Sequence, residues 1–215
     1  MARPRSQDYD LVKRSIINSA AVLFAKKGFV GTSIQEIAAA AGLTKAGVYH
    51  YFETKHEILR VMLGDHLRTV HGLVETALNE KGSPHARFKT VTRLLIECYT
   101  EPGSKDKHVV LMSDLDQLSA KDRQKIVATQ RRIVGAIGKL LPSLHPPLKR
   151  RESFNRPITM LYFGMINWID SWYSGRGRLP PAELATLAAT LFVNGLTHTD
   201  FSVISIRARR GRRKA

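Results

Sequence analysis

The chain has little cysteine, few aromatic residues and no long apolar run. Its one cysteine, Cys98, excludes an intramolecular disulfide, and the apolar setting LLIECYT favours a small buried side chain over a nucleophile. No stretch approaches about 18 apolar residues, and the N-terminus MARPRSQDYD lacks a signal-peptide core, so we expect a cytoplasmic protein. There is no glycine-rich phosphate loop, and His56-Glu57 lacks the second histidine of a zinc motif. We therefore expect no metal, no cofactor and no enzymatic activity.

Acidic residues are also scarce relative to basic ones. Lys and Arg number 34 against 18 Asp and Glu, a net charge of +16, which favours a polyanionic partner such as nucleic acid or an anionic membrane surface. The last nine residues, RARRGRRKA, contain six of these cations. We interpret 207–215 as a solvated basic tail, with a second polyanion contact as the alternative. A constitutive, charge-driven nucleic-acid binder stays open at this point.

Apolar residues recur every three or four positions, which predicts an all-α fold of about nine helices. Val12, Ile16, Ala20, Leu23 and Phe24 form the first such stripe, on a helix from about 8 to 27. Breaks rich in Pro, Gly and Ser separate the later helices, which we expect at 55–80, 85–99, 105–118, 120–140, 148–174 and 182–205.

Two short helices lie between the first helix and residue 55. Ser33 with Glu36 has the spacing of a capping box, Thr44 is a candidate N-cap, and Thr54 with Glu57 is a second capping box. Helices at 33–41 and 45–51 joined by a glycine-containing turn are typical of a helix-turn-helix, whose second helix enters the major groove of DNA. Val48 and Phe52 are predicted to face a small core with Ile34, Ile37 and Leu43. Lys45 and Tyr49 are predicted to face outward beside the bare Ala46-Gly47.

The stretch GFVGTSIQEIAAAAGLTKAGVYHYFETKHEIL, within residues 12–63, resembles the DNA-binding domain of the TetR family of bacterial transcriptional regulators. The resemblance implies that five positions approach bases or the adjoining backbone: Gln35, Lys45, Gly47, Tyr49 and His50. It implies phosphate contacts for Ser33, Thr44, Tyr51, Thr54 and Lys55. The alternative for these residues is structural: helix caps at Ser33, Thr44 and Thr54, a solvated Lys45 and a half-buried Tyr51.

The same resemblance makes 1–60 the helix-turn-helix DNA-binding domain and 61–206 a domain for ligand binding and homodimerisation. Small and apolar residues along one face of the last helix are candidates for the dimer interface: Leu184, Leu187, Ala188, Leu191 and Gly195. The aromatic helix 159–173 is mostly core by its pattern, and part of it is expected to line a pocket. Candidate ligand contacts are Cys98, Met165, Trp168, Trp172 and Arg176.

The pattern NWIDSWYSGRGRLPPAELA is similar to TetR-family members that sense acyl-CoA thioesters. Together with the basic 61–206 region, this predicts a homodimeric repressor of a palindromic operator, released by an acyl-CoA or another anionic amphipathic metabolite. Glu97 and Asp170 lie in apolar helical runs, where each could pair with an arginine, with solvent or with a cationic drug. An efflux regulator that senses apolar or cationic drugs is therefore the alternative.

Overall fold

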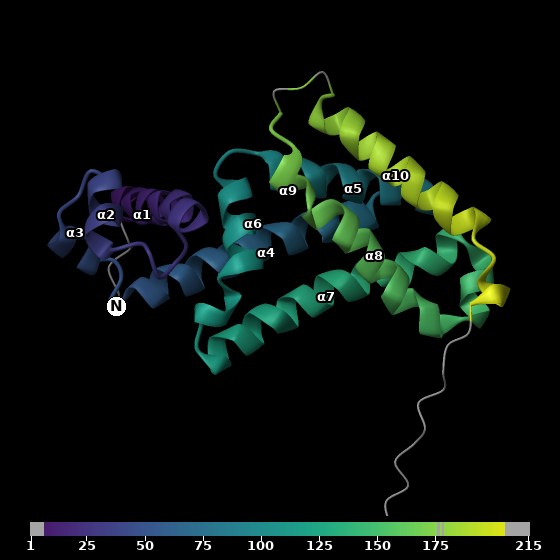
Figure 1. The fold of residues 1–215 in the computed structure, drawn as a ribbon, viewed down its shortest axis with the longest axis horizontal. Helices are drawn as coiled ribbons and strands as arrows, with labels where there is room; N and C mark the ends of the chain where they lie inside the picture. Colours follow the sequence, from purple (N-terminus) through teal and green to yellow (C-terminus); the bar gives the residue numbers. More distant parts are fainter. Residues whose placement is uncertain (1–6, 176, 178, 205–215) are drawn as a thin grey trace, which may run out of the picture.

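A computed structural model describes residues 7–175, 177 and 179–204 and forms helices and turns without a strand over those residues (Figure 1), which confirms the all-α prediction. The tail 207–215 lies outside the described residues. A small lobe occupies one end of the molecule. It consists of α1 (Gln7–Lys27), α2 (Ile34–Ala40), α3 (Lys45–Tyr49) and the start of α4 (Lys55–Asn79).

The small lobe has the core that the apolar pattern predicted. Phe24, Ile37, Val48 and Phe52 are at most 1% exposed, and Ile34, Leu23 and Leu43 pack against them partly buried. Gly28 ends α1 and Gly42 follows α2, each with a positive φ (75° and 70°) that suits glycine. These local signals explain why the short helices begin and end where the sequence indicated.

The larger part of the molecule is built around α4, which continues without interruption from the small lobe past residue 60 (Figure 1). Helices α5, α6 and α7 pack against it, α8 packs on α7, and α10 lies along α5. Their bounds are α5 (Pro84–Thr100), α6 (Ser104–Ser113), α7 (Ala120–Leu144), α8 (Asn155–Asn167), α9 (Ile169–Trp172) and α10 (Pro181–His198).

Aromatic rings join α5, α8 and α10. The ring centroids of Phe88, Tyr162 and Phe192 lie 5.1–5.3 Å from one another, and the hydroxyl of Tyr162 is 3.0 Å from that of Thr92. A buried ring cluster of this kind contributes both apolar area and specific geometry. It holds α10 against the body of the chain.

Several helix boundaries differ from the prediction. The helix expected at 105–118 ends at Ser113 and is followed by a 3-10 turn at Leu115–Gln117. Helix α7 continues past Pro142 to Leu144, because burial of Leu141 and Leu144 offsets a proline near its last turn. The expected helix 148–174 begins only at Asn155 and is broken after Asn167 by a turn into α9, which nothing in the local sequence predicts. The last helix ends at His198, because Asp200 caps a following 3-10 turn by accepting from the Ser202 N–H at 2.8 Å.

The described helices include none that is long and apolar enough to cross a membrane.

Candidate DNA-contacting surface and effector cavity

Side-chain caps position the two short helices. Ser33 accepts from the Glu36 N–H at 3.2 Å and donates its own hydroxyl to Glu36 Oε2 at 2.9 Å. Thr44 accepts from the Gly47 N–H at 3.0 Å, and Thr54 accepts from the Glu57 N–H at 3.1 Å. The three hydroxyls are therefore helix caps, and caps are typically worth about 1 kcal/mol each. Phosphate contacts by the same residues stay a prediction.

An ion pair holds α2 against the end of α1. Lys27 Nζ lies 2.5 Å from Glu36 Oε1. This hydrogen bond, with those from Ser33, lowers the pKa of Glu36 to about 2. Gln35, the neighbouring residue on α2, is exposed.

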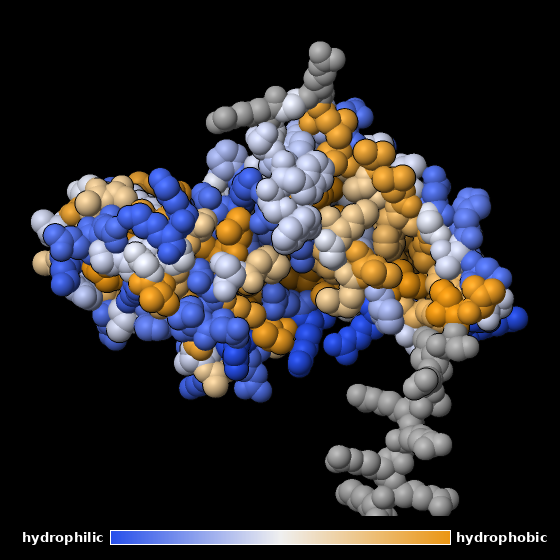
Figure 2. Space-filling view, in the orientation of Figure 1, coloured by the Kyte–Doolittle hydropathy of each residue, from blue (hydrophilic) through white to orange (hydrophobic). Residues whose placement is uncertain are grey.

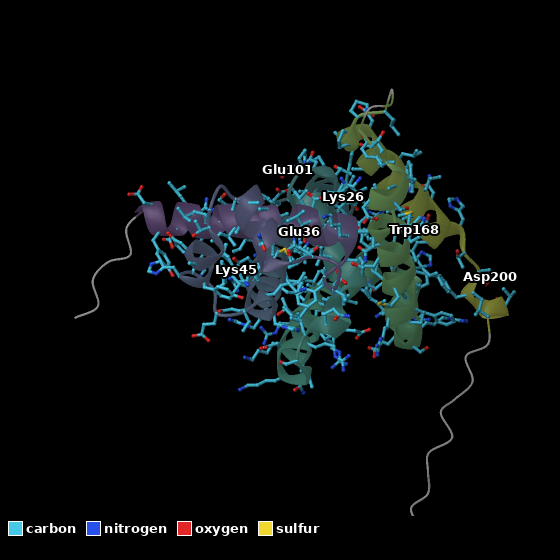
Figure 3. The ribbon with its side chains drawn as sticks, turned by 60° about the vertical axis from the view of Figure 1, so that its left-hand side comes forward. Lys26, Glu36, Lys45, Glu101, Trp168 and Asp200 are labelled. Atoms are coloured by element: carbon cyan, nitrogen blue, oxygen red, sulfur yellow. The ribbon has the colours of Figure 1, made fainter. Side chains whose placement is uncertain are left out.

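The outer face of α3 is open to solvent. Lys45 and His50 are exposed, Tyr49 is 46% exposed, and Lys45 lies on the small lobe in Figure 3. A Cβ added at Gly47 would meet only ordinary contacts, 3.4 Å from Thr44 Oγ1 and 3.6 Å from Leu43 Cβ. The fold therefore does not require glycine here, and the bare backbone is available to a close partner.

Tyr51 is half-buried by a residue that sequence reasoning missed. The ring of Tyr9, in the first turn of α1, lies 4.7 Å from Tyr51 and 6.3 Å from His50, while His50 and Tyr51 are 5.2 Å apart. These three rings form a cluster between the start of α1 and the end of α3. Because the contact joins positions about 40 residues apart, periodicity along either helix could not reveal it.

Lys55 has partners within the small lobe that sequence reasoning missed. Its ammonium donates to the carbonyls of Phe29 at 2.7 Å and Thr32 at 2.6 Å, and lies 4.3 Å from the Phe29 ring centroid. The side chain therefore ties the start of α4 to the α1–α2 loop, and a phosphate contact by Lys55 stays a prediction. Its partners lie 26 and 23 residues away, so local spacing gave no sign of them.

A cavity of about 770 Å³ lies in the larger part of the molecule, bounded by residues of α4 to α8. Its walls are largely apolar, and Leu67, Val70, Leu111, Ile133 and Phe163 contribute to them. A volume of this size is in the range of small-molecule sites, roughly 300–1,000 Å³.

Basic residues of α7 and α8 line one side of the cavity. Arg131, Gly135 and Lys139 recur every four residues on α7, so they share one helix face, and Arg156 comes from α8. All three cations are exposed, and a Cβ added at Gly135 would meet no atom within 4 Å. No Asp or Glu lines the cavity over the residues that the structure describes. The lining therefore favours anionic groups.

Two histidines are buried close to the cavity. His108 of α6 lines it, whereas His66 of α4 lies 5.8 Å behind, ring centroid to ring centroid. Burial lowers the pKa of His66 to about 3 and that of His108 to about 4, so both rings are neutral at neutral pH. His108 is stacked on Tyr99, with centroids 3.7 Å apart. In 7–175, 177 and 179–204, no group of three or more His, Cys, Asp or Glu could hold a metal ion.

The ligand contacts expected from the sequence do not lie in this cavity. Cys98 is buried elsewhere, with Sγ 3.1 Å from Ser104 Oγ and its pKa raised by burial, and Met165 packs half-buried on the core. Trp168 and Trp172 are 70% and 59% exposed, and Arg176 lies outside the described residues. On α8, Asn155, Thr159 and Phe163 line the cavity together with the exposed Met160. Contact of the five predicted residues with an effector stays a prediction.

Cavity residues that the sequence reasoning missed are Arg131, Gly135, Lys139, Arg156 and His108. The four-residue spacing of Arg131, Gly135 and Lys139 was visible in QRRIVGAIGK. That spacing could have indicated a bare helix face between two cations. His108 had no such pattern.

An exposed apolar surface covers α8 and α10 (Figure 2). Leu161 on α8 is 72% exposed, and Leu187 and Leu191 on α10 are 47% and 60% exposed. Figure 3 shows Trp168 at the end of α8. Only part of the predicted dimer face is exposed in the structure. Leu187, Leu191 and Gly195 are exposed, whereas Leu184 and Ala188 are buried within the chain, where α10 packs along α5.

Two family models cover most of this architecture. Residues 16–62 match that of the bacterial regulatory proteins of the tetR family. Residues 81–196, over half of the chain, match the tetracyclin repressor-like C-terminal domain. The chain belongs to the TetR family. It is therefore a DNA-binding transcriptional regulator, and its small lobe carries the family's helix-turn-helix.

Individual TetR-family relatives span nearly the whole chain. The HTH-type transcriptional repressor KstR2 of Mycolicibacterium smegmatis is 24% identical, over 86% of this chain and 90% of its own. A TetR-family transcriptional regulator from Bordetella parapertussis is 33% identical, covers 91% and 98% of the two chains, and superposes with a TM-score of 0.80. AibR in complex with isovaleryl coenzyme A and operator DNA has a TM-score of 0.72 at 24% identity, over 84% and 97%.

Proposed function

We propose that this TetR-family regulator is a homodimeric repressor that binds a palindromic operator and is released by an anionic amphipathic metabolite, with an acyl-CoA thioester as the best candidate. The observation that carries the effector class is the lining of the 770 Å³ cavity, which combines apolar walls with three cations and includes no carboxylate among the described residues. An apolar acyl group suits the walls. The phosphates of a coenzyme A suit Arg131, Lys139 and Arg156.

The cationic-drug alternative loses its support from Glu97 and Asp170. Glu97 pairs with Arg93 on its own helix at 2.9 Å, and neither carboxylate lines the cavity. The structural neighbour AibR, which was crystallised in complex with isovaleryl coenzyme A and operator DNA, has the same fold. It supports a thioester effector by analogy.

The homodimer is supported by the exposed face of α8 and α10. Leu161, Leu187 and Leu191 form an apolar surface that a monomer would leave in water. Gly164 and Gly195 are exposed on the same helices, and a Cβ at either would meet no atom within 4 Å, so a second copy could approach closely. A two-fold dimer also presents two recognition helices to the half-sites of a palindrome.

Two helices link the cavity with the small lobe. Helix α4 begins in the lobe and contributes Leu67 and Val70 to the cavity wall. Helix α6 contributes His108 and Leu111 to the wall and packs against α1 of the lobe. An effector that favours one arrangement of α4 and α6 would therefore change the placement of α3 and weaken operator binding.

Fluorescence anisotropy with a duplex selected by the protein from a random library tests the operator part. The wild type should prefer the selected palindrome to unrelated duplexes by roughly 10³-fold or more. Lys45→Ala with Tyr49→Ala should abolish that preference while leaving a folded dimer. Equal binding of unrelated duplexes by the wild type would favour the charge-driven alternative, and wild-type affinity in the double variant would contradict the role of α3.

A thermal-shift screen of acyl-CoA thioesters, free acids and cationic dyes, followed by operator release, tests the effector part. Thioesters should stabilise the protein and release the duplex. Gly135→Trp should fill the cavity and prevent release while keeping operator affinity, with Gly135→Ala as the matched control, since its methyl group has room. Stabilisation by dyes alone would sink the thioester assignment.

A further inference from the structure

The cavity wall contains polar side chains whose hydrogen-bonding atoms have no protein partner. His108 is 2% exposed, and neither of its ring nitrogens makes a hydrogen bond to the described part of the chain. The same holds for Oδ1 of Asn167, at the end of α8, within the described ranges. The Asn167 backbone carbonyl interacts weakly with the His108 ring and acts to raise a pKa that burial holds low, but this contact falls outside hydrogen-bond geometry. The two residues are therefore neighbours in the cavity wall.

The position of these two residues is well determined by packing. The His108 ring is stacked on Tyr99 with an interplanar angle of 17°. The amide nitrogen of Asn167 faces Met112 Sδ at 4.0 Å. By contrast, Thr159, which also lines the cavity, already donates its hydroxyl to the Asn155 carbonyl at 2.7 Å. His108 and Asn167 therefore keep hydrogen-bonding capacity for a ligand, as does Oδ1 of Asn155 at the start of α8, but only His108 and Asn167 are shown to be neighbours.

The chemistry that fits this pair follows from its donors and acceptors. A neutral imidazole offers one N–H donor and one acceptor nitrogen, and Asn167 Oδ1 is an acceptor. A hydroxyl group can accept from the His108 N–H and donate to Asn167 Oδ1 at the same time. A plain hydrocarbon would leave the hydrogen-bonding atoms of both residues without a partner.

We propose that His108 and Asn167 form a hydrogen-bonding subsite for a hydroxyl group on the apolar part of the effector. The effector is then a hydroxylated chain rather than a plain hydrocarbon one. This inference rests on the proposed function only in taking the cavity as the effector site. It does not depend on coenzyme A, because the subsite recognises the buried end of the ligand and not its anionic head.

Small aromatic probes isolate this subsite from the head group. Phenol and toluene differ by a hydroxyl in place of a methyl, and both are small enough to enter the cavity. We would measure their dissociation constants on the full-length protein by NMR, following the Ile133 methyl groups in the cavity wall. In His108→Phe the phenol-to-toluene ratio of dissociation constants should rise at least about fivefold, since phenol loses its partner while toluene does not.

His66→Phe is the matched control, because His66 is equally buried, at 3% exposed, and does not line the cavity. Its ratio should equal that of the wild type. Asn167→Leu should move the ratio in the same direction as His108→Phe, and it keeps the test available if His108→Phe does not fold. Histidine selectively labelled with ¹⁵N should show a ring-nitrogen shift at His108 with phenol but not with toluene.

An unchanged ratio in His108→Phe and Asn167→Leu, an equal change in His66→Phe, or no binding of phenol at millimolar concentrations would overturn the subsite. These outcomes are separate from those of the proposed function. If no thioester releases operator DNA but the phenol ratio responds to His108, the thioester assignment falls and the subsite stands. If thioesters release DNA and the ratio does not respond, the reverse holds.

Discussion

Acidification from pH 8 to pH 5 should destabilise this protein through His66 and His108. In the unfolded chain each histidine has a pKa near 6.5, whereas burial lowers the folded values to about 3 and about 4. Between pH 8 and pH 5 the unfolded state therefore takes up almost one proton at each position and the folded state almost none. Stability rises with pH wherever the unfolded state binds more protons, so it falls as the pH drops below 6.5.

The magnitude follows from the size of the pKa shifts. At pH 5 each histidine destabilises the folded state by roughly 2 kcal/mol relative to pH 8, or about 4 kcal/mol for both, at 1.36 kcal/mol per pH unit. This is a large part of the roughly 5–15 kcal/mol typical of a folded domain. Glu36, whose pKa is lowered to about 2, loses its stabilising contribution only below its ordinary value of 4.5. The comparison at pH 5 therefore excludes Glu36. Burial raises the pKa of Asp170, and its protonation acts in the opposite direction, because the folded state then takes up the proton first.

Urea unfolding at pH 8 and pH 5, at one protein concentration, would measure the effect. The double variant His66→Phe with His108→Phe should lose about 4 kcal/mol less than the wild type between the two pH values, and each single variant about half of that. The exposed His85→Phe controls for exchanging a histidine for a phenylalanine. If the double variant is destabilised by acid as strongly as the wild type, the buried pair does not cause the effect.

Two further predictions concern Lys55 and the exposed face of α10. Lys55→Met should lower the free energy of unfolding by about 1–3 kcal/mol, because it removes two charge-assisted hydrogen bonds to the α1–α2 loop. Urea unfolding would show this against the exposed Lys26→Met, and an equal loss in both variants would contradict it. Leu191→Glu should convert the dimer to monomer at micromolar concentration in analytical ultracentrifugation, by placing a charge in the apolar face. Leu11→Glu, an equally exposed leucine on α1 (59%), should leave the dimer intact, and a dimeric Leu191→Glu would argue against that interface.

The small lobe was predictable because its signals are local. Caps at Ser33, Thr44 and Thr54 act within three residues, and glycine with a positive φ follows both α1 and α2. Burial of Val48 and Phe52 follows from helical periodicity within one short segment. Lys55 and Tyr9 escaped prediction there because their partners lie far away in sequence.

The larger part was predictable in class and not in detail. Its helices follow from apolar spacing and from proline and glycine breaks. The cavity requires five helices to meet at one place, and no pattern along a single helix states which of its faces turns inward. The aromatic segment 159–173 illustrates this. Its tryptophans are of a residue type common in ligand pockets, yet they are exposed on the outer surface. Helix α10 is a second example. It is apolar on two sides, and its sequence does not indicate that the side with Leu184 and Ala188 packs inside the chain while the other side is exposed.

By itself the sequence determined an all-α chain, a helix-turn-helix, its outward Lys45 and Tyr49, and membership of the TetR family, because capping, periodicity and close motif spacing act over a few residues. Only the tertiary structure decided where the cavity lies, that Arg131, Lys139 and Arg156 line it, and that His108 and Asn167 keep unused hydrogen-bonding atoms in its wall. Those properties depend on side chains from helices that are distant in sequence. Their contacts and burial are set by packing between helices, and packing is not encoded in any one segment.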